Sequence, residues 1–406
     1  MQDSSTDVVV VGGGPAGMMA GLLLARAGIP VTVLEKHKDF FRDFRGDTVH
    51  PSTMQLLQSM GLLERFLVRP HNRIDSAEID WNGRTLRIGD LSHLRMAAPF
   101  IAMMPQWEFL DFLRCEAEKI PHFELRMNAE VVDVVEDAET RVSGVKLASG
   151  EVLGARRLVL MCDGRTSLAR SLLPVLSLGV PIDVFWFAVP KTSEGQTLRG
   201  TIRDRRFLVS IDRGDYWQCA FVIAKGSAED VRKRGIEQFR SDLLDVAPHL
   251  ENLEDCLPNF DSVSLLSVSL DRLERWHRPG LLAIGDAAHA MSPVGGIGIN
   301  LAIQDAVCAA NILAGALMEG RPVDPLLEQV QAKRLLPTRL IQGAQAAAHR
   351  NILAPVVLGD GGLPEEPPLP LRVLDRIPLL RRIPGYLIGH GIAMERLTAP
   401  QLARYV

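Results

Sequence analysis

Two carboxylates in the sequence occupy the position at which parallel β-sheets bind ligands. Glu35 and Asp286 each follow a short apolar run that is typical of a strand buried on both faces. A side chain at the carboxyl end of a parallel strand points into the crevice where open α/β sheets hold ligands. A carboxylate there can accept hydrogen bonds from the hydroxyls of a ribose or another polyol. The two acids therefore predict a site for a nucleotide-like ligand.

A βαβ unit positions the first of these acids. Residues 7–11 read DVVVV, a β-branched run after one aspartate, and residues 12–17 read GGGPAG, which satisfies G-x-G-x-x-G. A helix is expected over residues 18–27, with Gly28 as the residue that ends it. A second strand over residues 31–34 then leads to the acid. Strand, turn, helix and second strand fall in the order that a dinucleotide-binding unit requires.

Each glycine of the turn has a physical task. Gly12 permits the tight passage from strand to helix, Gly14 lets the backbone approach a pyrophosphate, and Gly17 lets the helix pack closely on the strand. The helix N-terminus, where Pro15 is well tolerated, offers free N–H groups to the pyrophosphate. Glu35 can bind the ribose hydroxyls and repels a 2′-phosphate, so the unit indicates FAD or NAD.

A later segment distinguishes between these two cofactors. Asp286 follows the strand expected over residues 281–285 and can bind a polyol, and FAD has one in its ribityl chain whereas NAD has none. Residues 293–300 contain three glycines that let the backbone lie against a flat ring. A long apolar helix expected over residues 301–317 directs its positive end at that ring, where it would stabilise a reduced flavin. The sequence therefore predicts FAD.

Three motifs together resemble those of the class A flavoprotein monooxygenases, the family of para-hydroxybenzoate hydroxylase. GxGxxG spans residues 12–17, DGxxSxxR spans 163–170, and GDAAHxxxPxxGxGxN spans 285–300. The resemblance covers about residues 8–396. It implies an α/β fold with a Rossmann-like FAD-binding domain, an inserted, mainly antiparallel β-sheet substrate domain and a C-terminal helical region.

The resemblance also implies roles for individual residues. Asp286 would hold the ribityl chain, and Asp163 would contact FAD near its pyrophosphate in a segment that also handles NAD(P)H. Arg45 and Gln106 resemble FAD contacts of the family, and Val131 would meet the adenine through its backbone. The complete predicted cofactor-binding set is Gly12, Gly14, Pro15, Ala16, Gly17, Glu35, Lys36, Arg45, Gln106, Val131, Asp163, Asp286, Pro293, Gly295, Gly296, Gly298, Ile299 and Asn300.

The chemistry of the family implies an aromatic hydroxylase. NADH or NADPH would reduce FAD, and O2 would add at flavin C4a to give a hydroperoxide that hydroxylates a phenolic or heteroaromatic ring. No second GxGxxG is present, so NAD(P)H is expected to bind transiently. No catalytic base is assigned, because isolated histidines such as His50, His71 and His93 are more often solvated or structural than catalytic. His289 is expected to shape the flavin loop.

Other functions on this fold remain open at this stage. A halogenase is one, although residues 185–190 (FWFAVP) resemble the GWxWxIP segment of those enzymes only distantly. A flavin-dependent reductase that acts without oxygen is the second. The third is a non-enzymatic binding protein on the same nucleotide fold, against which Asp286 and the flavin loop argue.

The substrate domain is expected to be a β-sheet built from residues 74–101 and 179–270, in which apolar and polar residues alternate. Tight turns are expected at residues 81–84 and 213–215. Several aromatic and sulfur side chains could line a pocket there or be ordinary core. They are Met103, Trp186, Phe187, Tyr216 and Trp217.

The expected domains are discontinuous in sequence. The FAD-binding domain takes residues 1–73, 102–178 and 271–330, the substrate domain takes 74–101 and 179–270, and the C-terminal helical region takes 331–406. Helix is expected to break near residues 363–370 and to resume from Leu371 to Pro384. Pro370 directly precedes that segment and Pro378 and Pro384 lie within it. These three prolines favour packing over the protein body or at a dimer contact rather than on a membrane surface.

Composition limits the partners. The 406 residues carry a net charge of −4 without a long basic run, which argues against nucleic acid. The five cysteines lie far apart with no CxxC, so neither a metal site nor a disulfide framework is expected. No basic leader and no uninterrupted apolar stretch of membrane-spanning length are present. We expect a cytoplasmic monomer or homodimer whose partners are a small aromatic substrate, O2 and NAD(P)H.

Overall fold

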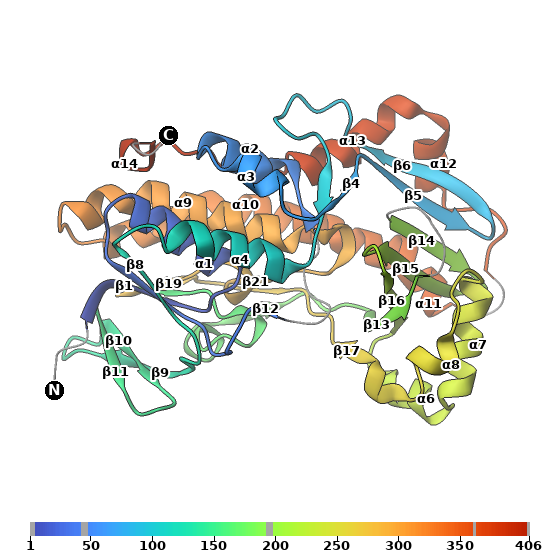
Figure 1. Cartoon of the computed structure of the whole chain (residues 1–406), viewed down its shortest axis with the longest axis horizontal. Helices are drawn as coiled ribbons and strands as arrows, with labels where there is room; N and C mark the ends of the chain where they lie inside the picture. The colour runs from blue at the N-terminus through green and yellow to red at the C-terminus, as the bar shows by residue number, and fades with distance from the viewer. Residues whose placement is uncertain (1–4, 42–47, 192–197, 360–362, 404–406) are drawn as a thin grey trace.

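The computed structural model describes residues 5–41, 48–191, 198–359 and 363–403. Its main sheet contains parallel strands in the order β20-β11-β1-β2-β8 (Figure 1). They are β1 (Ser5–Val11), β2 (Val31–Leu34), β8 (Phe123–Arg126), β11 (Val152–Met161) and β20 (Leu281–Ala283). The antiparallel strands that extend the sheet are β9 (Val131–Glu136), β10 (Val142–Leu147) and β19 (His277–Arg278). The Rossmann-like core expected from the sequence is confirmed.

Apolar helices cover this sheet. Helix α1 (Pro15–Arg26) packs against α9 (Gly298–Met318) and α4 (Gln106–Ala117). Every residue of α1 after Pro15 is buried, which explains why its sequence has no polar face. Helix α9 is long and apolar enough to cross a membrane by composition, yet 78% of its apolar window is buried within the fold. It is therefore a core helix, and polar residues such as Gln304 and Asp305 interrupt its apolar sequence.

A second sheet has the order β17-β13-β16-β15-β14-β5-β6 and is antiparallel except between β14 and β5. Its strands are β5 (Ser76–Trp81), β6 (Arg84–Asp90), β13 (Ile182–Pro190), β14 (Leu198–Arg203), β15 (Arg206–Asp212), β16 (Tyr216–Ala224) and β17 (Ser264–Leu266). Asn82 and Gly83, with φ of 48° and 83°, form the predicted two-residue turn. Helices α6 (Ala228–Lys233), α7 (Ile236–Val246) and α8 (Leu253–Cys256) cover its outer face. The mainly antiparallel sheet from two separated segments is confirmed.

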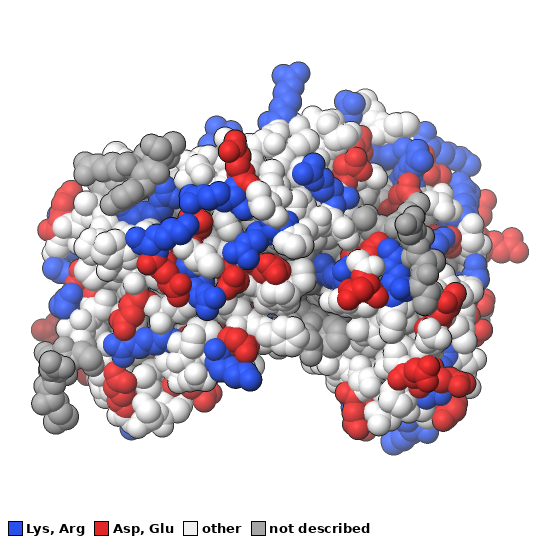
Figure 2. Space-filling model, in the orientation of Figure 1, with Lys and Arg blue, Asp and Glu red and all other residues white. Residues whose placement is uncertain are grey.

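Short elements connect the two large sheets. One small sheet has the order β3-β7-β4 and another the order β12-β18-β21. Their strands are β3 (Thr48–Val49), β4 (Asn72–Ile74), β7 (Ile101–Met103), β12 (Val175–Ser177), β18 (Asp271–Leu273) and β21 (His289–Ala290). The short helices of this part are α2 (Pro51–Ser59), α3 (Leu63–Leu67) and α5 (Ala169–Leu172). A notch separates the lobe with β9 to β11 from the lobe with α6 to α8, and charges of both signs intermingle on this face (Figure 2).

The C-terminal part is helical, as expected, but its boundaries differ from the prediction. Its helices are α10 (Asp324–Ala348), α11 (Ala354–Val357), α12 (Leu369–Arg376), α13 (Pro378–Gly389) and α14 (Pro400–Ala403). The proposed domain boundary at 330/331 falls inside α10. Pro370 and Pro378 begin helices, whereas Pro384 lies inside α13, so the expected third break is wrong. Helix α13 continues because it packs on β6, where a Cβ at Gly385 would collide with the Asp90 carbonyl.

Candidate active site

The three glycine-containing motifs meet at one edge of the main sheet. The turns after β1, β11 and β20 are neighbours because these strands are adjacent. Gly12 has φ of +99°, and a Cβ there would lie 2.5 Å from the carbonyl oxygen of Cys162. Gly285 has φ of +61°, and its Cβ would lie 3.1 Å from the Cβ of Ala16. Glycine is therefore required at both positions, for its backbone angle and for the close approach of the segments.

Glu35 is fixed beside the first turn. Its Oε2 accepts a hydrogen bond from the Gly13 N–H at 3.0 Å, and its Oε1 accepts one from the His37 N–H at 3.1 Å. The Glu35 carbonyl accepts from the N–H of Ala129 at 2.9 Å. This bond brings the start of β9, with Val131, next to Glu35, while Lys36 is exposed. The predicted ribose and adenine contacts thus come from neighbouring segments.

The second and third motifs contact each other through two arginines. Arg165 donates from Nε to Asp286 Oδ2 at 3.1 Å and from Nη2 to the Met291 carbonyl at 2.8 Å. Arg170 donates to the Asp286 carbonyl at 2.9 Å and pairs with Asp271 at 2.7 Å. Sequence reasoning missed Arg165 and Asp271 as residues of this site. The position of Arg165 within the DG motif was the available signal.

Asp163 has an oxygen that needs a partner. Its Oδ2 accepts from the N–H of Leu168 at 3.0 Å, whereas its buried Oδ1 has no hydrogen-bond partner. Burial raises the pKa of this carboxyl, and the hydrogen bonds from Ser167 and Leu168 oppose the rise. Nearby, the space in front of Gly14 is open, with no atom within 4 Å of a built Cβ. Gly14 is the N-cap of α1, and the first N–H groups of a helix have no partner within the helix.

The glycine loop expected to line the flavin ring is tied to β3 and α2. Thr48 donates from Oγ1 to the Gly296 carbonyl at 2.8 Å. Asn300 Oδ1 accepts from Thr53 Oγ1 at 2.7 Å and from the His50 N–H at 3.3 Å. The side-chain nitrogen of Asn300 is buried without a partner. Helix α9 begins at Gly298 rather than Leu301, because Ile297 already has helical backbone angles of −82° and −18°.

The remaining predicted residues occupy the same part of the molecule or lie outside the described residues. Pro293 precedes a turn of 3-10 helix formed by Val294–Gly296, and Ile299 is buried in the first turn of α9. Gln106 is the first residue of α4, which packs beside α1. Arg45 lies outside the described residues.

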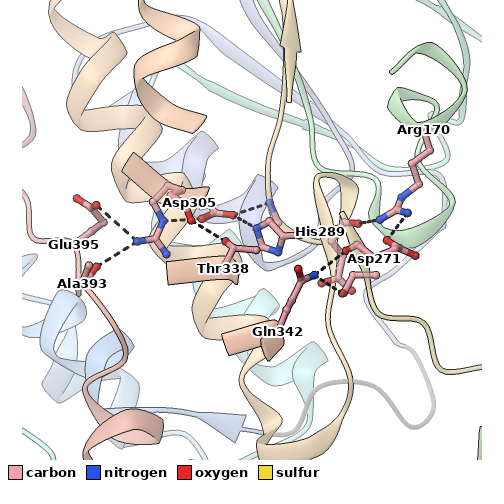
Figure 3. Close-up of polar contacts among 12 residues, drawn as sticks. Arg170, Asp271, His289, Asp305, Thr338, Gln342, Ala393 and Glu395 are labelled. Atoms are coloured by element: carbon pink, nitrogen blue, oxygen red, sulfur yellow. Dashed lines mark hydrogen bonds and ion pairs between the residues drawn. The ribbon is translucent and has the colours of Figure 1, made fainter. Parts of the chain in front are cut away.

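A buried network of charged side chains, centred on Asp305 of α9, holds the motif over residues 285–300 in place (Figure 3). Asp305, which is fully buried, accepts hydrogen bonds from the Gly285 N–H at 3.1 Å, from His289 Nε2 at 2.6 Å and from Arg334 Nε at 2.8 Å. Burial raises the pKa of Asp305, but His289 and Arg334 more than offset this, so the pKa lies below its usual 3.8. Arg334 also lies 3.7 Å from Glu395. His289 is only 1% exposed, a geometry that favours its structural role.

The second sheet turns only some of the candidate pocket residues toward the flavin loop. Trp186 packs in a cluster with Val294 of the loop and in another with Met103 of β7. Phe187 and Trp217 instead belong to the cluster under α6 to α8, on the opposite face. These two are core residues of the outer layer. Trp186, Met103 and Tyr216, which the strand pairing places on the same face as Trp186, remain as candidates for lining the substrate pocket.

Two of the three other histidines have defined structural surroundings. His50 is completely buried, and its Nδ1 lies 2.9 Å from the Ile388 carbonyl. Burial lowers the pKa of His50 from 6.5 to about 4. His71 stacks between Phe66 and Phe100. None of these contacts assigns a base, which agrees with the open assignment from the sequence.

Comparison with known proteins identifies the class that this fold and site define. A family model described as an FAD binding domain matches residues 5–343. The chain is 32% identical over 366 residues to 6-methylpretetramide 4-monooxygenase of Streptomyces rimosus, covering 86% of this chain and 85% of that protein. It is 27% identical to para-nitrophenol 4-monooxygenase of Pseudomonas sp., and the match covers 79% of this chain and 81% of that protein. The protein is an FAD-dependent monooxygenase. It belongs to the class A flavin-dependent aromatic monooxygenases, the para-hydroxybenzoate hydroxylase-like family.

Solved structures show the same fold. A probable FAD-dependent monooxygenase of Pseudomonas aeruginosa superposes with a TM-score of 0.73 at 22% identity, covering 86% of this chain and 97% of that one. The flavin-dependent brominase Bmp2 also superposes with a TM-score of 0.73, at 16% identity, and the match covers 98% of this chain and 97% of the brominase chain. A probable monooxygenase and a brominase thus share this scaffold, so the fold alone does not choose between their reactions. The sequence relatives, which are monooxygenases, support hydroxylation.

Proposed function

We propose that this enzyme hydroxylates a phenolic or heteroaromatic small molecule and holds FAD across the edge where its three motifs meet. The observation that carries the proposal is the unpaired Oδ1 of Asp163 beside the open N-terminus of α1. A buried unpaired acceptor and the N–H groups of a helix N-terminus, which follow adjacent strands of the sheet, fit a ligand with both hydroxyls and phosphates. When bound, FAD supplies the activation of O2 that side chains cannot provide.

The residues of this chain bind and orient. In the proposal, the N–H groups at the start of α1 bind the pyrophosphate, Glu35 binds the ribose and Asp286 binds the ribityl chain. Residues 293–300 would lie along the flavin ring, and the N-terminus of α9 would favour negative charge there. The inner face of the second sheet would exclude water from the reacting ring. Arg165 would hold the Asp286 carboxylate in place through their 3.1 Å contact.

The proposal also covers the reductant, the substrate class, the cellular compartment and the oligomeric state. NADPH or NADH would bind transiently in the same region, because the sequence offers no second dinucleotide turn. The relatives described above are named for the oxygenation of 6-methylpretetramide and of para-nitrophenol, and we place the substrate of this enzyme among aromatic compounds as well. We further propose a cytoplasmic enzyme that is a monomer or homodimer.

A single preparation tests the proposal. The purified protein should show flavin absorption bands, and it should consume O2 with NADPH or NADH faster when a suitable phenol is added. Mass spectrometry should find a product heavier by one oxygen atom. A folded, FAD-loaded enzyme that uses no O2 with any phenol or heteroaromatic compound would contradict the proposal. Bromide-dependent halogenation without hydroxylation would point to the halogenase instead.

A further inference from the structure

The face of the second sheet that packs against the flavin loop carries two polar side chains, Trp186 and Gln218. Side chains of directly paired residues on neighbouring strands lie on the same face. Trp186 pairs with Ala220, and Ala220 pairs with Val209. The residue two places before Ala220, Gln218, therefore shares the face of Trp186. This face packs against Val294 of the loop, whereas Trp217 faces the helices behind the sheet.

The amide of Gln218 has a fixed orientation. Arg213 Nε donates to Gln218 Oε1 at 2.9 Å. Because a guanidinium has donors only, the oxygen of the amide must face Arg213 and the NH2 group must point away. Gln218 is 3% exposed, and its Nε2 is buried without a hydrogen-bond partner. Two N–H donors are thus left unpaired in the interior.

Trp186 presents a second donor of the same kind. Its Nε1 is also buried without a partner. An indole nitrogen can only donate, as can the NH2 group of a fixed amide. Buried polar groups are nearly always satisfied in folded proteins, and each exception calls for an explanation, such as a catalytic role or a bound water or ion. Here two unpaired donors lie on one face of the sheet, and one of them belongs to a side chain that packs in a cluster with Val294 of the predicted flavin loop, so a bound ligand is the explanation that we adopt.

We propose that Trp186 and Gln218 form a substrate subsite that binds an acceptor oxygen conjugated to the aromatic ring, either a phenolate or a carbonyl. The inference rests on the function proposed above and deepens it. Both donors are uncharged, so they suit an oxygen that carries partial negative charge delocalised into a ring. Holding that oxygen fixes which ring carbon faces the flavin, so the pair sets the position of hydroxylation.

The test titrates the FAD-loaded enzyme with three probes and follows the flavin absorption. The probes are 2-naphthol, 2-acetylnaphthalene and naphthalene, which carry a phenolic oxygen, a carbonyl oxygen and no oxygen. The wild type should bind at least one oxygenated probe about ten-fold more tightly than naphthalene. Trp186→Phe and Gln218→Met should each weaken that binding about five- to fifteen-fold, the effect of about one hydrogen bond, and should leave naphthalene unchanged. Tighter binding of 2-naphthol would indicate that the subsite takes a phenolate, and tighter binding of 2-acetylnaphthalene would indicate a carbonyl.

Trp217→Phe is the matched control, because it makes the same replacement on the opposite face of the same sheet. It should leave the binding of all probes unchanged but lower the melting temperature, since Trp217 packs on His249 and Lys191. Trp186→Phe and Gln218→Met should not lower the ligand-free melting temperature as much. Equal binding of the three probes, or a preference that survives both variants, would overturn the subsite. Failure of every aromatic compound to bind or to stimulate NADPH oxidation would instead overturn the proposed function itself.

Discussion

Replacing Asp305 by asparagine removes the negative charge at the centre of the network in Figure 3. The two carboxylate oxygens of Asp305 accept hydrogen bonds from Gly285, His289 and Arg334. The side chain of an asparagine has only one acceptor oxygen, so its NH2 group would have to face at least one of these three N–H donors and could not accept a hydrogen bond from it. It also leaves the Arg334 guanidinium, which is 1% exposed, without the anion 2.8 Å away.

The cost of this substitution follows from burial. Removing one partner of a buried ion pair destabilises a protein by about 3–5 kcal/mol. At about 2.1 cal/mol/K per residue, the 406 residues give an unfolding entropy of about 0.85 kcal/mol/K. The expected fall in melting temperature is therefore about 4–6 °C. FAD should also bind more weakly, because Gly285 and the adjacent Asp286 lose their support.

The pH dependence has a definite sign. The folded-state pKa of Asp305 lies below 3.8, so its contribution to stability is fully present above that value. The contribution is lost as the pH falls through the lowered pKa, because protonation then favours the unfolded chain. The difference in stability between wild type and Asp305→Asn should hardly change between about pH 5 and 8 and should shrink below about pH 4.

Thermal unfolding followed by circular dichroism and by flavin fluorescence measures both effects. Glu229→Gln is the control, since it breaks a pair with Arg232 in which the two side chains are 71% and 34% exposed, and it should cost under about 0.5 kcal/mol. The double variant Asp305→Asn/Arg334→Met removes both charges and should recover part of the loss. A fall of less than about 1 °C in Asp305→Asn would refute the reasoning.

Three further predictions follow from the site. Asp286→Ala should weaken FAD binding by about ten- to one-hundred-fold through loss of a charged hydrogen bond, measured by equilibrium dialysis, and unchanged affinity would contradict the ribityl assignment. Gly12→Ala should lower the melting temperature and the FAD content more than Gly28→Ala. Both glycines have a positive φ, but an added Cβ collides with neighbouring atoms only at Gly12. Equal effects of the two substitutions would count against the close approach of Gly12 to Cys162. His50→Gln should make the free energy of unfolding less dependent on pH. In the wild type, the stability that the neutral His50 side chain contributes is present above pH 6.5 and falls by about 3 kcal/mol as the pH drops to about 4. Urea unfolding at several pH values can check this.

The parallel core and the motif residues were predictable because their signals are local. A buried strand, a glycine turn and a following acid lie within one short stretch of chain, so Gly12, Glu35 and Asp286 could be placed at the sheet edge from the sequence. The assignment of FAD contacts to individual residues stays a prediction. Proline positions were less informative, since Pro384 sits inside a helix whose packing on β6 outweighs the lost hydrogen bond.

The orientation of the second sheet could not be predicted. Strand β16 is buried on both faces, so its sequence shows no alternation that would distinguish Trp217 from Gln218. The pairing of Asp305 with Arg334 was equally invisible, because residues far apart on two separate helices come together only in the folded chain. Arg165 was missed for a different reason: its contact with Asp286 joins two motifs whose proximity the sequence alone does not show.

The Asp305 network also bears on the order in which the enzyme matures during synthesis. Arg334 donates to the Ala393 carbonyl at 3.2 Å, and Lys333 pairs with Glu395 at 2.7 Å. The backbone around Asp286 is therefore braced by residues that leave the ribosome more than a hundred positions later. A nascent chain can form the βαβ unit early but lacks this brace until residue 395 is made. Cofactor capture should accordingly be a late event, and chains stalled before that point should hold FAD poorly.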